Sequence, residues 1–260
     1  MFGKFLFTSL LFLTFFQVQG LIGRTEMGKI FRPTDGPQYW RAGLADPDKQ
    51  WKTGYSAKTL AYCWESQNDF PKSVKKVFND SELELFKDME MLLGIPEYKV
   101  PLPGGIRPSQ SDLFVLAKPN LLNQTVVIMV EGKVSEPFGK KVGEWIKDNS
   151  PGKQERLKFL LHKLQIPYTE QILNTRYQLL HRTVSAVITA EKFGAENALM
   201  LVHSFNRDKG RESQLFADYC QFLQLFGVKG NINSIISARN LKGVNLYVGW
   251  IEGDEKYLDK

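Results

Sequence analysis

The sequence predicts an α/β (α+β) protein in which helices flank a mixed central sheet that contains an antiparallel hairpin. Two neighbouring segments, 112–117 and 125–134, are rich in β-branched and aromatic residues and are separated by the turn-like stretch KPNLLNQ. Apolar residues at helical spacing precede and follow this pair, and two further apolar strand-like segments come later in the chain. This order of elements is typical of a mixed sheet packed with helices.

Composition limits the classes of function. The 260 residues are 43% hydrophobic and 24% charged, enough for one large domain or two small ones, and not typical of a disordered or fibrous chain. The net charge of +6 slightly favours polyanionic partners, although solubility alone explains it. Cys63 and Cys220 form no C-x-x-C pair, and the three histidines lack metal-ligand spacing, which disfavours zinc and thiol redox chemistry.

Several sequence motifs are missing, and their absence excludes other enzyme classes. The chain has no G-x-x-x-x-G-K-[ST] loop, no G-x-G-x-x-G after a strand and no G-x-S-x-G elbow. We therefore expect no nucleotide or dinucleotide cofactor, and the commonest esterase mechanism is disfavoured.

The amino terminus resembles a secretory signal. Residues 1–20 contain a lysine, an apolar run over 5–16, and Val18 and Gly20 at the spacing that signal peptidase accepts. The run is short for a transmembrane helix, although its extension through Ile22 keeps a membrane anchor as an alternative. On this reading the protein is secreted or membrane-anchored.

An alternative start at Met27 gives a different compartment. Residues 1–26 are then a mis-assigned start instead of a signal-like hydrophobic extension, and the protein is cytoplasmic. The lack of a disulfide framework agrees with this second reading. In both cases we expect a single domain over 27–260.

The first half of the chain predicts helices followed by strands. We expect a short helix at 39–44, a helix capped by Ser56, and a helix at 81–93 ended by glycine and proline. The stretch 98–104 is extended but carries two prolines, which favours an edge strand.

The second half predicts further helices and two strands. Helices are expected at 154–165 and 170–193, then a strand at 197–205, an amphipathic helix at 213–227 and a last strand at 244–252.

The charged end of the predicted hairpin is the candidate site. A turn centred on Leu121 and Leu122 places Asp112 opposite Glu131, and alternation puts Glu131 and Lys133 on one face. Two carboxylates suit Mg²⁺, which takes one or two protein carboxylates together with waters and substrate phosphate. The lysine is placed to orient or deprotonate a water or to stabilise developing charge. The alternative is a surface cluster of cross-strand salt bridges.

This pattern resembles the D…(D/E)-x-K signature of the PD-(D/E)xK, or restriction-endonuclease-like, nuclease superfamily. The resemblance rests on the segments SDLFVLA and EGK and on the order of elements. Eighteen residues separate the aspartate of the first segment from the glutamate of the second. It implies a restriction-endonuclease-like core that binds Mg²⁺ or Mn²⁺ through Asp112 and Glu131, with the Gly132 carbonyl and Glu65 as further ligands. Lys133 is then the catalytic lysine. Serine replaces the proline before the aspartate, and a glycine inside the motif is a further departure.

The resemblance also implies a substrate. The helix that contains RYQLLHR follows the core hairpin, so Arg176, Gln178 and Arg182 are expected near the scissile phosphate or the nucleic-acid backbone. The implied activity is Mg²⁺-dependent phosphodiester hydrolysis, with DNA favoured over RNA. Basic residues are frequent after the hairpin, which fits either a solvated face or a phosphate track.

A closer resemblance covers most of the chain. LADPDKQWKTGYSAKTLAYCWES, LPGG…PSQSDLFVLA and VEGKVSEPFGKKVGEW are similar to a family of uncharacterised bacterial proteins, a domain of unknown function. Two alternatives to the nuclease therefore stay open. One is a catalytically inactive module that binds nucleic acid or protein on the same fold, and the other is an exported or membrane-tethered protein of unknown function.

Overall fold

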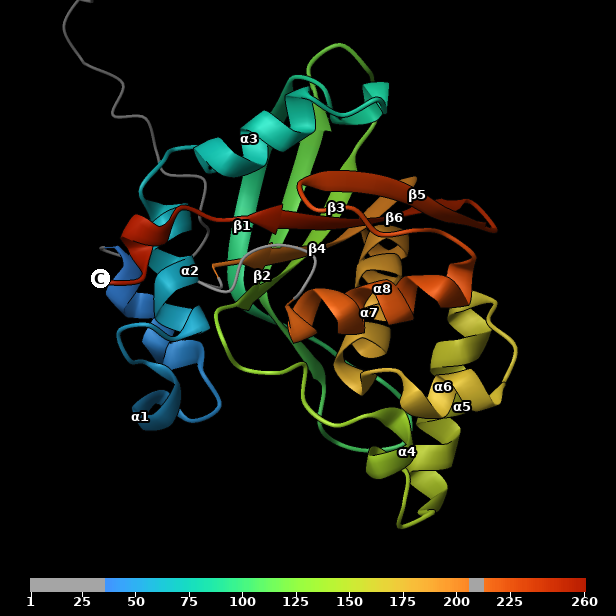
Figure 1. Ribbon diagram of the computed structural model, residues 1–260. Coiled ribbons are helices and arrows are strands. Elements are labelled where there is room, and N and C mark those ends of the chain that lie inside the picture. The colour runs from blue at the N-terminus through green and yellow to red at the C-terminus, as the bar shows by residue number, and fades with distance from the viewer. Residues whose placement is uncertain (1–35, 206–212) are drawn as a thin grey trace, which may run out of the picture.

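A computed structural model describes residues 36–205 and 213–260 (Figure 1). The predictions made for 1–26 and for a start at Met27 lie outside the described residues. Within the described part of the chain, no helix is both long and apolar enough to span a bilayer.

A mixed sheet forms the centre of the fold, as predicted, and it has six strands (Figure 1). Its strand order is β1-β2-β3-β4-β6-β5, with β3, β4 and β6 parallel and the remaining neighbours antiparallel. The strands are β1 (Met89–Val100), β2 (Ser109–Pro119), β3 (Val126–Lys133), β4 (Asn197–Ser204), β5 (Ser234–Leu241) and β6 (Val244–Glu252).

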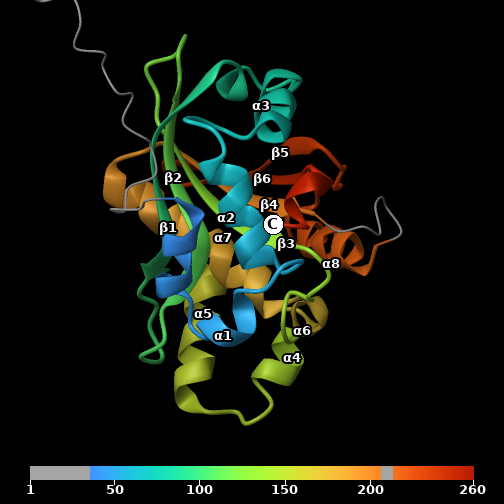
Figure 2. The ribbon, with the colours of Figure 1, turned by 90° about the vertical axis from the view of Figure 1, so that its left-hand side faces the viewer.

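Helices cover both faces of this sheet (Figures 1 and 2). Helices α2 and α3 pack on one face, and α7, with α5 and α8 beside it, packs on the other. The helical elements are η1 (Pro37–Gly43), α1 (Pro47–Gln50), α2 (Ser56–Glu65), α3 (Lys72–Asn79), η2 (Glu84–Phe86), α4 (Val142–Trp145), α5 (Pro151–Leu164), α6 (Glu170–Asn174), α7 (Tyr177–Phe193), α8 (Gln214–Leu223), η3 (Gln224–Phe226) and η4 (Glu255–Tyr257).

The predicted hairpin is confirmed with its register. Strands β2 and β3 are antiparallel, and Leu113 pairs with Val130. One further step along the same register places Asp112 opposite Glu131. Because directly opposed residues lie on the same face of a sheet, the two carboxylates emerge on one side.

Strand β3 is buried along its whole length, which explains its unbroken apolar run. Val127 and Met129 pack in the core beneath α7, whereas Ile128 and Val130 pack in the core beneath α2 and α3. Because side chains alternate between the two faces along a strand, Glu131 lies on the same side as Val127 and Met129, which is the α7 side of the sheet.

The predicted helix at 81–93 is wrong. The structure has the short turn η2 there, followed by β1, which begins at Met89 and pairs with β2. The apolar residues at 83, 86, 89 and 93 fit a helical stripe, but Met89 and Met91 instead alternate with more exposed neighbours in a strand. Pairing with β2 decided the outcome, and 98–104 is the end of this edge strand and the loop after it.

The predicted helix at 170–193 is two helices. Residues Thr175 and Arg176 have extended backbones between α6 and α7, and Arg176 forms an isolated bridge with Lys141. Ser56 is the first residue of α2, not its cap, because Tyr55 occupies the cap position. Strand β5 was not predicted, because its mixed polar sequence SIISARNL lies at the sheet edge.

Candidate active site

A cavity of about 460 Å³ opens where β3 ends and β2 begins. One wall is the segment 44–57, which includes α1 and the start of α2. The opposite wall is the first part of α7, and the floor carries side chains from β1, β2 and β3. The cavity contains Asp112, Glu131 and Lys133, so the three residues of the predicted motif are brought together.

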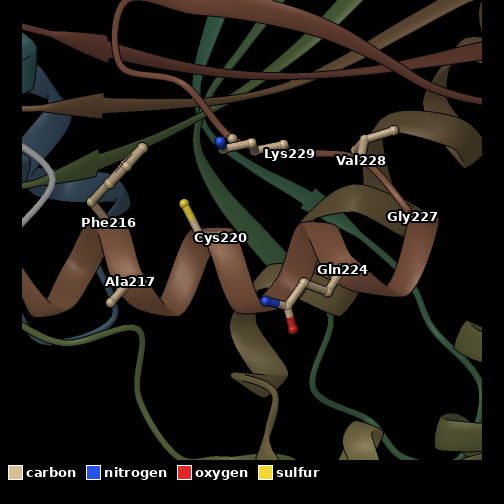
Figure 3. Close-up of a pocket in the computed structure, with 8 residues that line it drawn as sticks. Phe216, Ala217, Cys220, Gln224, Gly227, Val228 and Lys229 are labelled. Carbon is tan, nitrogen blue, oxygen red and sulfur yellow. The ribbon is translucent and has the colours of Figure 1, made fainter.

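A larger hollow of about 680 Å³ runs along α8 (Figure 3). Among the described residues, its lining consists mainly of apolar groups and glycines, with Lys229 as the charged residue and no carboxylate. The acid-lined cavity therefore has the stronger claim to chemistry.

Glu131 is the centre of a hydrogen-bonded network. Its Oε1 accepts from Lys133 Nζ at 2.9 Å and from Gln178 Nε2 at 2.7 Å, and its Oε2 accepts from Arg182 Nε at 2.5 Å. The residue is 2% exposed. A carboxylate this deeply buried persists as an anion only with such partners.

Charge partners determine the ionisation of this network. Burial alone raises the pKa of Glu131, but Arg182 and Lys133 outweigh it and hold the pKa below its usual value. Burial lowers the pKa of Arg182, but Glu131 and Asp112 raise it by more, so the pKa of Arg182 lies above its usual value. Glu131 is therefore an anion between two cations.

Asp112 has the opposite electrostatic setting. Its Oδ2 accepts from the Gly132 amide at 2.7 Å, which leaves its other oxygen out of that bond. Burial, followed by repulsion from Glu131 and Glu97, raises the pKa of Asp112 well above its usual value. Added positive charge in the cavity would favour its ionised form.

Gly132 allows α2 to lie close to the motif. A Cβ at this position would come within 3.3 Å of Leu60 on α2 and 3.4 Å of Asp112 Oδ2. The glycine, an unexpected residue in a core strand, is thus explained by a tight approach between helix and strand.

A second layer holds Arg182. Its Nη1 lies 3.3 Å from Ser109 Oγ, and the same hydroxyl lies 2.8 Å from His181 Nδ1. Burial and the nearby cations, Arg182 first, keep the pKa of His181 well below its usual value. His181 is therefore a neutral packing residue that adds no charge to the cavity.

Two acidic residues outside the predicted site set, Glu97 and Glu136, also line the cavity. Glu97 on β1 is 6% exposed, has a φ of 53° and accepts from Gln110 Nε2 at 2.6 Å. Glu136 accepts from the Ser56 amide at 3.0 Å and so fixes the start of α2. Glu97 was hidden by the mistaken boundary of β1, whereas EGKVSE did place Glu136 close to the motif.

Three predicted residues, Gly132, Glu65 and Arg176, are not among the residues that line the cavity. The Glu65 carboxylate on α2 accepts from Trp40 Nε1 at 2.8 Å. Arg176 Nε donates to Asp218 at 2.8 Å, and its Nη1 donates to the Gly139 carbonyl at 2.7 Å. These three bonds join segments that are distant in sequence, which gives Glu65 and Arg176 a structural role.

Several basic side chains in the segment after the hairpin make contacts within the fold. Arg156 donates to the carbonyls of Leu102, Pro103 and Gly105, and Lys163 pairs with Glu191. Together with Arg176 and Arg182, these contacts remove several cations from any surface track for a phosphate backbone.

The ranges 36–205 and 213–260 contain His, Cys, Asp and Glu side chains of the types that bind metal ions. No group of three or more His, Cys, Asp or Glu side chains there is arranged to hold a metal ion. The two opposed carboxylates of Asp112 and Glu131 are fewer than a structural zinc site needs, but they match the small carboxylate set that Mg²⁺ uses.

Comparisons with known proteins show the family. No curated protein and no solved structure matches the chain. A family model described as Domain of unknown function (DUF6946) matches residues 33–255. The expected membership of an uncharacterised family is confirmed, and the chain belongs to this domain family of unknown function.

Proposed function

We propose that this protein is a Mg²⁺-dependent phosphodiesterase that hydrolyses nucleic acid on a restriction-endonuclease-like core. The observation that carries the proposal is the meeting of Asp112, Glu131 and Lys133 in one cavity at the end of β3. Their separation in sequence and their order in the hairpin match the nuclease motif that they resemble.

The charge of the cavity favours a bound cation. Among the described residues that line the cavity, four are acidic and three are basic. The acidic residues are Glu97, Asp112, Glu131 and Glu136, and the basic residues are Lys49, Lys133 and Arg182. Repulsion from the carboxylates opposes a phosphodiester that enters without a cation, and a bound cation would also favour the ionised form of Asp112. Asp112 and Glu131 would hold Mg²⁺ or Mn²⁺, and the Gly132 carbonyl is a further candidate ligand. Such an ion polarises a phosphoryl oxygen and lowers the pKa of bound water.

Lys133 has the placement of the catalytic lysine. Its ammonium is fixed by Glu131 Oε1 and lies 5.0 Å from the centre of the Phe138 ring. In this position it donates hydrogen bonds to a water or to a non-bridging phosphate oxygen. Water adds to phosphorus, one P–O ester bond breaks, and the products are a phosphomonoester and an alcohol.

Gln178 and Arg182 position Glu131 and are placed to face the substrate phosphate. Both come from the first turns of α7 and donate to different oxygens of the same carboxylate. They hold Glu131 in one orientation before any ligand arrives, which lowers the cost of organising the site.

A second candidate function is a binding module without turnover. The observation that favours it is that both oxygens of Glu131 already accept hydrogen bonds from three side chains. If these donors are not exchanged for a cation, the cavity binds nucleic acid or protein and cleaves nothing.

Cleavage assays separate the two candidates. The wild type, Glu131→Ala and Asp112→Asn are incubated with plasmid and single-stranded DNA and RNA, with Mg²⁺ or with a chelator. We expect cleavage by the wild type only, and only with the cation, while Glu65→Gln outside the cavity keeps full activity. Circular dichroism checks that the variants are folded. Cleavage that survives in folded Asp112→Asn and Glu131→Ala would reject the assignment, and calorimetry without Mg²⁺ binding would favour the silent module.

A further inference from the structure

Glu131 and Lys133 of the proposed site lie deep in the cavity, and Asp112 beside them is half-buried. Glu131 is 2% exposed and Lys133 is 4% exposed, although both line the hollow. A phosphate on the outside of a rigid duplex would have to enter this hollow to reach them. A volume of about 460 Å³ admits a group of small-ligand size.

The wall opposite α7 is firmly attached. Gln110 on β2 donates to the Gly43 carbonyl at 3.0 Å, and the Ser56 amide donates to Glu136 at 3.0 Å. Asp46 caps α1 by accepting from the Lys49 amide at 3.3 Å. The wall is therefore tied at both ends to the sheet side of the cavity, and it stands over the acids.

An exposed aromatic ring stands on this wall. Tyr55 lines the cavity and yet is 46% exposed, and the Lys52 ammonium lies 5.8 Å from its ring centre. The Tyr55 amide donates to the Lys52 carbonyl at 3.1 Å, which fixes the two residues in one turn. A large exposed ring beside a cation provides a surface for stacking an unpaired base.

Basic and aromatic residues alternate along the same wall. In the stretch DKQWKTGY, Lys49 precedes Trp51, and Lys52 lies between Trp51 and Tyr55. The pair of Lys49 with Asp46 is highly exposed and therefore weak, so Lys49 is able to turn toward a phosphate. Single-strand binding proteins combine cationic grooves with stacking rings in this way.

We infer that the substrate is a single-stranded nucleic acid, with one base stacked on Tyr55 and the adjoining phosphate reaching down to Asp112 and Glu131. This inference rests on the proposed function and specifies its substrate class. A duplex is disfavoured because its bases are already stacked on each other and its backbone is too stiff to bend into the cavity.

Binding is measured apart from cleavage, by fluorescence anisotropy with a labelled dT12 strand and a blunt duplex of matched length in Ca²⁺. We expect dT12 to bind at least tenfold more tightly than the duplex. Tyr55→Ala weakens dT12 binding on the order of tenfold, and Tyr55→Phe retains it, because stacking uses the ring and not the hydroxyl. Tyr168→Ala is the matched control, since Tyr168 is exposed but lies outside the cavity lining.

The outcomes distinguish this inference from the proposed function. Equal binding of strand and duplex, or unchanged dT12 binding by Tyr55→Ala, overturns the inference even if the wild type cleaves DNA with Mg²⁺. Tight dT12 binding that depends on Tyr55, without any cleavage, supports the substrate class while the proposed hydrolysis fails. Binding of a free mononucleotide but not of dT12 would also overturn it.

Discussion

Arg182 and Glu131 form an ion pair that joins α7 to the end of β3. Their atoms Nε and Oε2 are 2.5 Å apart, and their side chains are 9% and 3% exposed. The pair connects residues 51 positions apart in the chain, so it exists only in the folded protein.

Removing one partner of this pair should cost much of the folding stability. Arg182→Met leaves Glu131 buried with Lys133 as its remaining cation, and we expect the free energy of unfolding to fall by about 3–5 kcal/mol. Urea denaturation measures the change. Lys163→Met, which breaks the more exposed pair with Glu191, is the control and should cost less than about 1 kcal/mol. Equal effects of the two substitutions would contradict the assigned burial.

Two substitutions should separate cation binding from turnover. Lys133→Met removes one donor to Glu131, so we expect Mg²⁺ binding to be retained while the cleavage rate falls by roughly 10²-fold or more. Asp112→Asn removes a carboxylate and should lose both binding and cleavage. Calorimetry and single-turnover cleavage give the two quantities. Loss of Mg²⁺ binding in folded Lys133→Met would argue against these separate roles.

Gly132→Ala should disturb the contact between α2 and the motif. The new Cβ lies within 3.3 Å of Leu60, and we expect a loss of about 1–3 kcal/mol together with reduced cleavage. Combining it with Leu60→Ala removes the contact with Leu60 Cδ2 and leaves the contact with Leu60 Cβ. The double variant should therefore lose less stability than the sum of the single losses, as measured by a double-mutant cycle in urea. Simple additivity would mean that the two residues are not coupled.

His203 should make stability depend on pH. It is fully buried, accepts from Trp64 Nε1 at 3.1 Å, and burial lowers its pKa from 6.5 to about 3. Because the pKa is depressed in the folded state, its contribution is present above pH 6.5 and is lost as the pH falls toward 3. Between pH 7 and pH 5 the expected loss is about 2 kcal/mol.

Urea denaturation across this pH range tests the role of His203. His203→Gln keeps an acceptor for Trp64 and should reduce the pH dependence, whereas His162→Gln, at an exposed position, should leave it unchanged. An undiminished slope in His203→Gln would assign the effect to other groups.

The β-branched and aromatic segments 112–117 and 125–134 predicted the hairpin, and a turn centred on Leu121 and Leu122 predicted its register, because the position of the turn decides which residues of a hairpin face each other. Asp112, Glu131 and Lys133 therefore came together in the prediction as they do in the structure. The helix predicted at 81–93 failed because Met89 and Met91 at its end also have the alternate spacing of a strand, and pairing with β2 selected the strand.

The sequence by itself determined the mixed sheet, its central apolar strand and the charged end of that strand. Only the tertiary structure decided which residues surround the charges: Gln178 and Arg182 arrive with α7, Glu97 arrives with β1, and Glu65 and Arg176 are placed elsewhere. The physical reason is the separation in sequence over which each effect acts. Strand alternation acts between neighbouring residues, whereas the partners of a buried charge come from elements that only the packed core brings together.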